Sequence, residues 1–345
     1  MSTHHFVIQP ASDTKQVSAL KYPLNPLNSS WHVVSLAQRS ISGFHSRESP
    51  QSPAADHEPT TGTTLWLSSQ LLTLYLTGLY GHGGKKQERK LRAVELGSGI
   101  GLAALVLASL GIDVVATDLP VVIQQVLQEN IDTNLESVEM LVASRSERLA
   151  SVGRETGTID VKVLDWTADP STWRWDIAGW ISPKTSEGIE CIEWSETNIQ
   201  PPFDLVITSD TIYEQSLIPS LLQTLYQLSI LSKREFLDSS PYSKKNLYPP
   251  IYLSLERRDG DVIDWALRQA REMGFACDMV RTRKISKLMK KAGVFCRADP
   301  HYVDQSEEEG YTKLTEPIPA TSGGLGPWVG VEIWKLQLKP DLRKN

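Results

Sequence analysis

The sequence has 345 residues, a length that fits one large domain with extensions or two small domains. Its formal net charge is −6 and its pI is near 5.7, so we expect no nucleic-acid partner, because nucleic-acid binding needs a basic surface. The three cysteines lack the C-x-x-C spacing of zinc sites, and no apolar run reaches the roughly 20 residues that cross a bilayer. The N-terminus shows no secretory signal, so we expect a monomer without metal or membrane contact, in the cytoplasm or the nucleus.

Residues 1–58 are weakly patterned and are predicted to form an N-terminal extension, partly disordered or in short strands. Phe6–Ile8 and Trp31–Val34 are the candidates for those strands. The stretch 47–64 is rich in Ser, Pro, Thr and Gly, which is typical of a linker or a mobile loop. The remaining residues, 59–340, are predicted to form one domain.

A helix is predicted to follow this linker, since Leu67, Leu71 and Leu74 fall on one helical face. Trp66 stands at its start. The ring of Trp66 either borders a cofactor or packs in the core, and the spacing alone leaves both interpretations open.

A glycine-rich stretch then separates a buried strand, 91–96, from an apolar helix, 102–110. Strand, glycine turn and helix is the arrangement by which a doubly wound sheet binds a nucleotide-like ligand. A dinucleotide fingerprint would place its third glycine at Leu102, and the carboxylate of Glu95 would repel a pyrophosphate. The pattern therefore favours S-adenosylmethionine, which carries a sulfonium and an ammonium group and no phosphate. The candidate cofactor residues in this stretch are Glu95, Gly97, Ser98, Gly99 and Gly101.

The second predicted strand, 112–118, ends in Asp118, which Leu119 and Pro120 follow. An acid at the end of this strand accepts hydrogen bonds from ribose hydroxyls in related nucleotide sites. The alternative is that Asp118 caps the helix that Pro120 opens.

The third predicted strand, 158–166, ends in Asp165 and Trp166. The acid suits the exocyclic amine of adenine, and the ring suits stacking. The alternative for Asp165 is a turn cap at the end of the strand.

The fourth predicted strand, 203–210, is apolar and is followed by Asp210-Thr211-Ile212-Tyr213. Ligands bind at the carboxyl ends of the strands in an open doubly wound sheet. The first three strand ends are assigned to the cofactor, and Ser209 is a further cofactor candidate. Asp210 and Tyr213 are therefore left for the acceptor.

The rest of the chain completes the sheet. We predict a helix over 121–135, a loop or frayed helix over 137–157, and a tryptophan-rich surface insertion near 173–200. A second insertion is predicted near 233–249. Further strands are predicted at 251–255 and 275–281, a helix at 262–273, a basic solvated stripe at 281–291 whose alternative is a partner surface, and a final antiparallel edge strand at 329–336.

These elements predict an α/β fold with a doubly wound, mostly parallel seven-stranded sheet and an antiparallel edge strand. Leu65-Trp66, Glu95-x-Gly-x-Gly-x-Gly and Asp210-x-x-Tyr213 together resemble the class I (seven-β-strand) S-adenosylmethionine-dependent methyltransferases of methyltransferase family 16. The resemblance covers roughly residues 60–340. Family members typically methylate a lysine, and occasionally a histidine, of a partner protein.

The resemblance implies a role for each candidate residue. Glu95 and the glycines would line the methionine part, Asp118 would hold the ribose, Asp165 and Trp166 would flank the adenine, and Trp66 would close over the cofactor. Asp210 and Tyr213 would face the acceptor lysine. The N-terminal extension and the two insertions depart from the family pattern and leave the partner protein unidentified.

Methyl transfer from a sulfonium is an in-line displacement, helped mainly by positioning and by removal of water. The nucleophile must be a neutral amine, whereas a free lysine has a pKa near 10.4. We assign no general base and expect the proton to leave to solvent as the site closes. The alternatives are a small-molecule methyltransferase, a nicotinamide-dependent oxidoreductase, which Glu95 and Leu102 disfavour, and a non-catalytic binding protein on the same fold.

Overall fold

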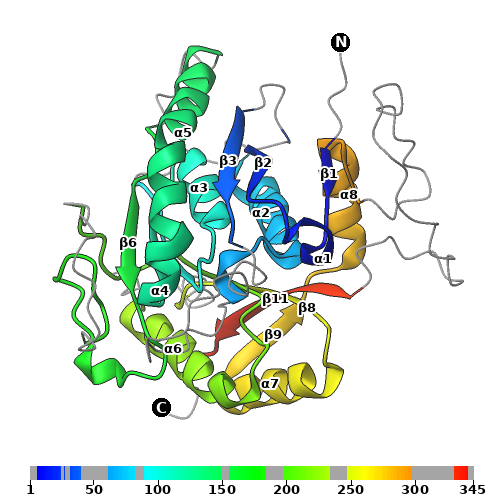
Figure 1. Cartoon of the computed structure of the whole chain (residues 1–345). Coiled ribbons are helices and arrows are strands. Elements are labelled where there is room, and N and C mark those ends of the chain that lie inside the picture. The colour runs from blue at the N-terminus through cyan, green and yellow to red at the C-terminus, as the bar shows by residue number, and fades with distance from the viewer. Residues whose placement is uncertain are drawn as a thin grey trace, which may run out of the picture.

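Seven strands form the central sheet of this protein in the order β6-β5-β4-β7-β8-β11-β9 (Figure 1). The computed structural model describes residues 6–24, 27, 32–39, 61–81, 89–148, 155–183, 197–233, 247–296 and 330–340. The strands of the sheet are β4 (Arg92–Leu96), β5 (Asp113–Asp118), β6 (Ile159–Val163), β7 (Leu205–Ser209), β8 (Ile251–Glu256), β9 (Phe275–Met279) and β11 (Val331–Leu338). The sheet confirms the predicted doubly wound, mostly parallel class.

The antiparallel strand is present, but its predicted place at the edge is wrong. β11 runs antiparallel to both β8 and β9 and lies between them, so β9 is the edge strand. The alternation over 329–336 reports which side chains are buried, and β11 does alternate in burial over most of its length. Alternation says nothing about how many neighbours a strand pairs with, so it cannot separate an edge strand from an inner one.

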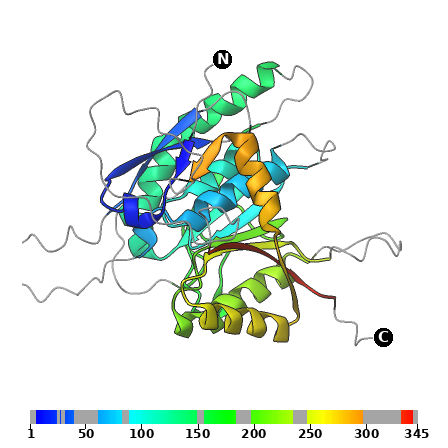
Figure 2. The ribbon, with the colours of Figure 1, turned by 90° about the vertical axis from the view of Figure 1, so that its right-hand side faces the viewer.

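Helices cover both faces of the sheet (Figures 1 and 2). The upper face carries α2 (Leu67–Tyr80), α3 (Leu102–Ser109) and α5 (Gln128–Arg148), and the lower face carries α6 (Ile218–Leu231) and α7 (Gly260–Glu272). Every residue of α3 is buried, because this helix lies between the sheet, α2 and α5. The side chains of the two faces form two separate hydrophobic clusters, one above and one below the sheet.

Shorter elements complete the fold. They are β1 (Phe6–Ile8), α1 (Ala11–Thr14), β2 (Ala19–Leu24), β3 (His32–Ala37), a 3-10 turn at Thr61–Thr63, α4 (Pro120–Val122), a π-helical stretch at Ile123–Leu127, 3-10 turns at Pro170–Thr172 and Gln215–Leu217, α8 (Thr282–Ala292) and β10 (Val294–Cys296). β1 pairs in parallel with β10, and α8 packs along α2. The basic stripe predicted at 281–291 is the exposed side of α8, whose Ile285 and Met289 are buried.

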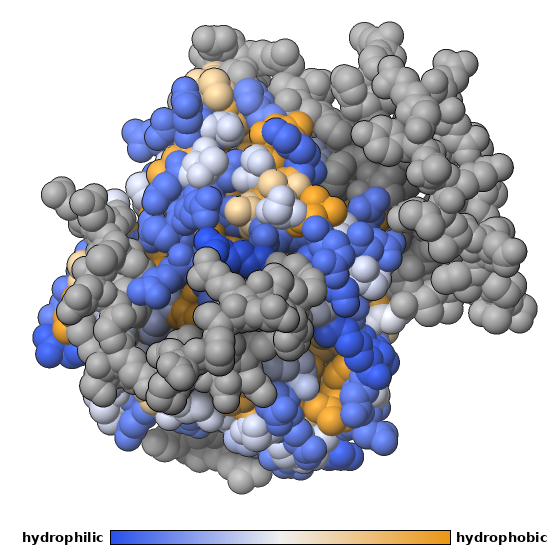
Figure 3. Space-filling model, viewed as in Figure 1, coloured by the Kyte–Doolittle hydropathy of each residue, from blue (hydrophilic) through white to orange (hydrophobic). Residues whose placement is uncertain are grey.

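Hydrophilic residues cover most of the described surface on the face shown in Figure 3, and apolar residues form small separate patches there. Within the described ranges, no helix combines the length and the apolar character needed to cross a membrane.

The helix predicted at 121–135 is longer than expected, and of the two alternatives predicted for 137–157, a loop or a frayed helix, the structure shows helix to residue 148. α5 continues to Arg148. The reason is that Val138, Leu141 and Val142 extend the buried stripe of Ile131 by two further turns. Many polar residues lie between these positions, on the solvent side of the helix. The sequence therefore does not show the apolar periodicity clearly.

The tryptophan-rich segment, predicted as a surface insertion, is exposed at Arg174, Asp176 and Ile177 but also packs side chains in the core. Trp173 and Trp180 are buried. The cause is a buried ion pair on β6: Lys162, which is fully buried, lies 3.4 Å from the carboxylate of Asp160. Lys162 Nζ also donates to the carbonyl of Trp175 and to Asn198 Oδ1, which ties both ends of the segment to the strand. Trp194 and most of the second insertion lie outside the described residues.

The N-terminal residues that are described form an antiparallel hairpin, β2–β3, which packs on α5. Two asparagines one helical turn apart bind the backbone of β3. Asn130 accepts from the amide of Ala37 at 2.7 Å and donates to its carbonyl at 2.9 Å, and Asn134 does the same for Ser35. The side-chain amides thus replace the neighbouring strand that the free edge of the hairpin lacks.

Asn130→Ala should destabilise the protein by about 2–3 kcal/mol, because it leaves the backbone groups of Ala37 and the carbonyl of Ile100 without their partner. Thr133→Ala, on the exposed side of the same helix, should change stability by less than about 0.5 kcal/mol. Urea unfolding of both variants measures the difference. Equal stability of the two would show that the asparagine contacts do not hold the hairpin.

Candidate functional site

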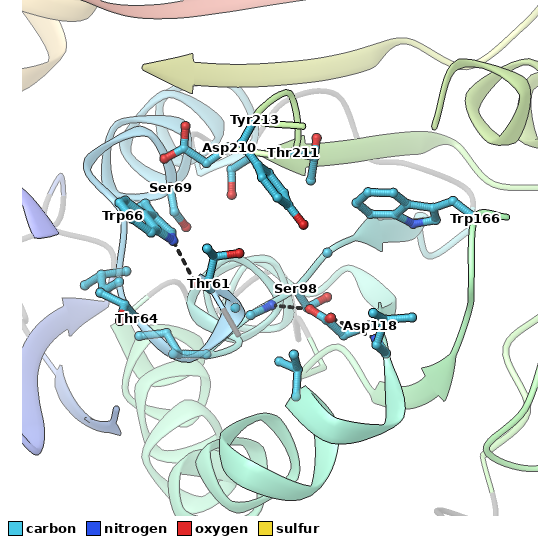
Figure 4. A pocket seen from close by; sticks show the side chains of 18 residues that line it. Thr61, Thr64, Trp66, Ser69, Ser98, Asp118, Trp166, Asp210, Thr211 and Tyr213 are labelled. Carbon is cyan, nitrogen blue, oxygen red and sulfur yellow. Dashed lines mark hydrogen bonds between the residues drawn. The ribbon is translucent and has the colours of Figure 1, made fainter. Parts of the chain in front are cut away.

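A pocket of about 290 Å³ opens at the carboxyl ends of the parallel strands, beside the start of α2 (Figure 4). The residues that line it come from five places: the segment before and at the start of α2, and the ends of β4, β5, β6 and β7. They are Thr61, Gly62, Thr64, Leu65, Trp66, Ser69, Gly97, Ser98, Gly99, Ile100, Asp118, Leu119, Val122, Trp166, Ser209, Asp210, Thr211 and Tyr213. The structure therefore brings together most of the residues predicted for the cofactor, and both residues predicted for the acceptor.

The turn after β4 needs its glycines. Gly97, Gly99 and Gly101 have φ values of +65°, +54° and +84°, which L side chains rarely adopt. A Cβ at Gly99 would lie 3.0 Å from the carbonyl oxygen of Gly62, across the pocket. A Cβ at Gly101 would instead meet the side chains of the helix that follows β5, so this glycine serves packing and does not line the pocket.

Asp118 ties the glycine turn to the end of β5. Its carboxylate accepts from the amide of Gly99 at 2.8 Å and from the amide of Leu119 at 2.8 Å. The alternative role as helix cap is not found, because the residue that caps α4 is Leu119. Burial raises the pKa of Asp118 to about 6, and the two amide hydrogen bonds oppose that rise. The carboxylate has lone pairs left, so it can still accept from ligand hydroxyls in the pocket.

Glu95 lies behind the turn and does not line the pocket. Its side chain is 1% exposed, and one carboxylate oxygen has no hydrogen-bond partner. Burial raises the pKa of Glu95 to about 8, and the nearby charge of Asp118 adds to that rise. Glu95 therefore holds its proton at neutral pH, so the direct contact with the methionine part implied by the resemblance does not follow from this geometry.

Of the two residues predicted after β6, one lines the pocket and the other does not. Trp166 lines the pocket on the side opposite Trp66 (Figure 4). Asp165 does not line it: its carboxylate accepts from the amide and hydroxyl of Thr167 at 2.8 and 2.7 Å. The structure shows the turn cap, the alternative for Asp165, and the contact of this residue with the adenine stays a prediction.

Asp210 is held tightly at the end of β7. It has a φ of +56°, and its side chain is only 7% exposed. One carboxylate oxygen accepts from the amide of Glu256 and the other from the guanidinium of Arg258, both at 3.0 Å. Burial raises the pKa of Asp210 above its usual value, while the charge of Arg258 lowers it.

Tyr213 is the accessible residue of the acceptor pair, with 52% of its surface exposed. In Figure 4 its hydroxyl points into the space between Trp166 and Asp118. The phenol thus lies at the mouth of the pocket and faces the glycine turn.

Sequence reasoning missed the wall formed by Thr61, Gly62 and Thr64, because composition assigned this stretch to a linker. Long-range contacts order it: Thr63 Oγ1 donates to the carbonyl of Arg39, and the amide of Leu65 donates to the side chain of Gln38. The nearby Trp66, whose Nε1 donates to the carbonyl of Thr61, was the signal available in the sequence. Ser69 and Thr211 were also missed. Among the described residues, no cluster of three potential metal ligands occurs.

Part of the chain that forms this site matches the model of a known protein family. The model of the lysine methyltransferase family matches residues 54–172, about a third of the chain. The matched range holds Trp66, the glycine turn, Asp118 and Trp166, and ends before Asp210. The match confirms the predicted resemblance, and S-adenosylmethionine, the cofactor that the glycine turn predicts, is the cofactor of this family.

Solved structures of methyltransferases share the general arrangement at low similarity. The N-terminal domain of human METTL16 in complex with SAH has 10% identity and a TM-score of 0.35, over 63% of this chain and 65% of that one. The ribosomal protein L11 methylase of Lactobacillus delbrueckii subsp. bulgaricus has 13% identity and a TM-score of 0.31, over 92% and 100% of the two chains. At TM-scores this low, the likeness carries no argument about activity.

The stability of the ligand-free protein should fall as the pH rises from about 6 to 8, because Glu95 keeps its proton in the folded state and loses it on unfolding. The loss is at most about 1.4 kcal/mol per pH unit. Glu95→Gln carries no titrating proton, so its stability relative to the wild type should rise over this range. Urea unfolding at several pH values measures both proteins, and parallel curves would contradict the raised pKa.

Gly99→Ala should weaken the binding of S-adenosylhomocysteine at least tenfold, because the new methyl group meets the carbonyl of Gly62 within the pocket. Gly111→Ala is the matched control. Gly111 also has a positive φ, +78°, and its Cβ would also lie 3.0 Å from a backbone oxygen, but it is not a pocket residue. Both variants should lose about 1–2 kcal/mol of stability. Calorimetry on folded protein compares them, and equal affinities would show that the turn does not carry the site.

Proposed function

We propose that this protein transfers methyl groups from S-adenosylmethionine to a lysine side chain of a partner protein. The observation that carries the proposal is that the glycine turn and the exposed Tyr213 line the same pocket. The cofactor turn and the residues after β7 face one another across this pocket. A methyl donor held by the turn would lie across this pocket from Tyr213, which meets solvent.

The size of the pocket supports an acceptor that enters from outside. A volume of about 290 Å³ is at the small end of the range for ligand clefts, which is roughly 300–1,000 Å³. A lysine side chain is long and thin and needs only a narrow channel, while the backbone of its protein stays at the surface.

Methyl transfer depends on the positioning of the lysine nitrogen and the methyl group more than on acid–base groups. The lone pair of the lysine nitrogen forms the new N–C bond while the C–S bond of the sulfonium breaks, which leaves a neutral thioether. The amine must lose its proton to water before this step. Trp66, Trp166 and Tyr213 supply an apolar surround that excludes water, and exclusion of water favours the neutral amine.

The direct test is incubation of the purified protein with methyl-labelled S-adenosylmethionine and a protein extract, followed by a gel. We expect a labelled protein band that yields methyl-lysine on hydrolysis and that S-adenosylhomocysteine suppresses. Label confined to small molecules would support the small-molecule alternative. An absence of any label, with S-adenosylhomocysteine still bound, would support a non-catalytic binding protein.

Tyr213→Ala should slow labelling of the band about tenfold or more, while the affinity for S-adenosylhomocysteine stays within a few-fold of the wild type. The ring lines the acceptor side, and its exposure means that little folding stability depends on it. Tyr213→Phe keeps the ring, so it should lose at most about tenfold, the value of one neutral hydrogen bond. Wild-type rates in a stable Tyr213→Ala protein would remove this residue from the acceptor site.

A further inference from the structure

Arg258, two residues after the end of β8, connects the two sides of the pocket. Its guanidinium lies over the ring of Trp66, with 4.3 Å between its central carbon and the ring centroid. The same group donates to Asp210 at 3.0 Å. Trp66 lies beside the cofactor turn and Asp210 at the acceptor end, so one side chain contacts both walls.

Each carboxylate oxygen of Asp210 accepts one hydrogen bond, so the carboxylate keeps lone pairs that could accept from an incoming ammonium group. One oxygen is held by the amide of Glu256, and the other by Arg258. A buried carboxylate next to an amine would stabilise the ammonium form, and methyl transfer needs the opposite. The positive charge of Arg258 removes this conflict.

The other charged groups around this cluster are accounted for. Glu256 lies 3.2 Å from the guanidinium of Arg258 and accepts from the amide of Leu67 at the start of α2. The amino end of a helix carries a partial positive charge, which offsets part of the negative charge of the Glu256 carboxylate. Across the pocket, Asp118 is bound by two backbone amides, and Tyr213 contributes its phenol ring.

We propose that Arg258 is a positioning residue that balances the charge of Asp210 and fixes the ring of Trp66, so that a lysine amine enters the acceptor end without its proton. The proposal rests on the proposed function, because it concerns an amine acceptor. The amine proton leaves to water, the nitrogen lone pair forms the N–C bond, and the sulfonium becomes a neutral thioether. Arg258 itself exchanges no proton or bond in this sequence.

The test measures the rate of methyl labelling of the extract band between pH 6 and pH 10, at saturating S-adenosylmethionine. Arg258→Met keeps a long apolar chain over Trp66 and removes the charge. We expect the acid limb of its profile to move up by about one pH unit, which is about a tenfold loss of rate at pH 7. A merely structural role would lower the rate equally at every pH and leave the limb in place.

Two further variants isolate the charge. Asp210→Asn combined with Arg258→Met removes both members of the ion pair, and its acid limb should return toward the wild-type position. Arg257→Met is the matched control, because Arg257 pairs with Glu332 and Asp264 instead. Its acid limb should not move. An unshifted limb in Arg258→Met, or one that the double variant does not restore, would overturn the charge-balancing role.

The second part of the proposal, that Arg258 fixes the ring of Trp66, is tested by the affinity for S-adenosylhomocysteine alone. This test does not depend on finding the acceptor. Calorimetry should show about a threefold weaker affinity for Arg258→Met, the effect of one partly exposed cation–π contact, and no change for Arg257→Met. Unchanged affinity in Arg258→Met would overturn this part. If the wild type binds S-adenosylhomocysteine but labels no protein, the proposed function fails, and this measurement still decides whether Arg258 positions Trp66.

Discussion

The hydrogen bond from the amide of Gly99 to Asp118 is the contact on which the site depends, because it joins the turn after β4 to the end of β5. It forms only if the turn takes a left-handed path, and three glycines supply that path. The same path brings the turn against Gly62, which closes one wall of the pocket. Asp118 is thus a structural anchor first, with lone pairs left over for a ligand.

The two sides of the pocket are built by different means. The cofactor side consists mainly of strand ends that neighbour one another in a parallel sheet, and the family match covers this side. The acceptor side depends on a contact between distant segments: Asp210 after β7 is bound by Arg258 after β8, which also lies over Trp66. This division agrees with a fold that keeps one cofactor while its acceptor side varies.

Sequence patterns predicted the strands, the glycine turn and the pocket positions of Asp118, Trp166 and Asp210, since parallel strands bring their carboxyl ends to one edge. They failed where tertiary contacts decide. Arg258 was invisible because its role comes from Trp66 and Asp210, which only the folded sheet brings to it. The length of α5 was missed because a narrow apolar stripe can lie among many polar residues.

The asparagine contacts to β3 have a consequence for synthesis on the ribosome. The partners are separated by 93 and 99 residues in the chain, so the N-terminal hairpin emerges long before α5 exists. At about 5–20 residues per second the wait lasts roughly 5–20 seconds. The hairpin can therefore dock only after residues 130–134 have emerged, and until then its free strand edge is open to other chains.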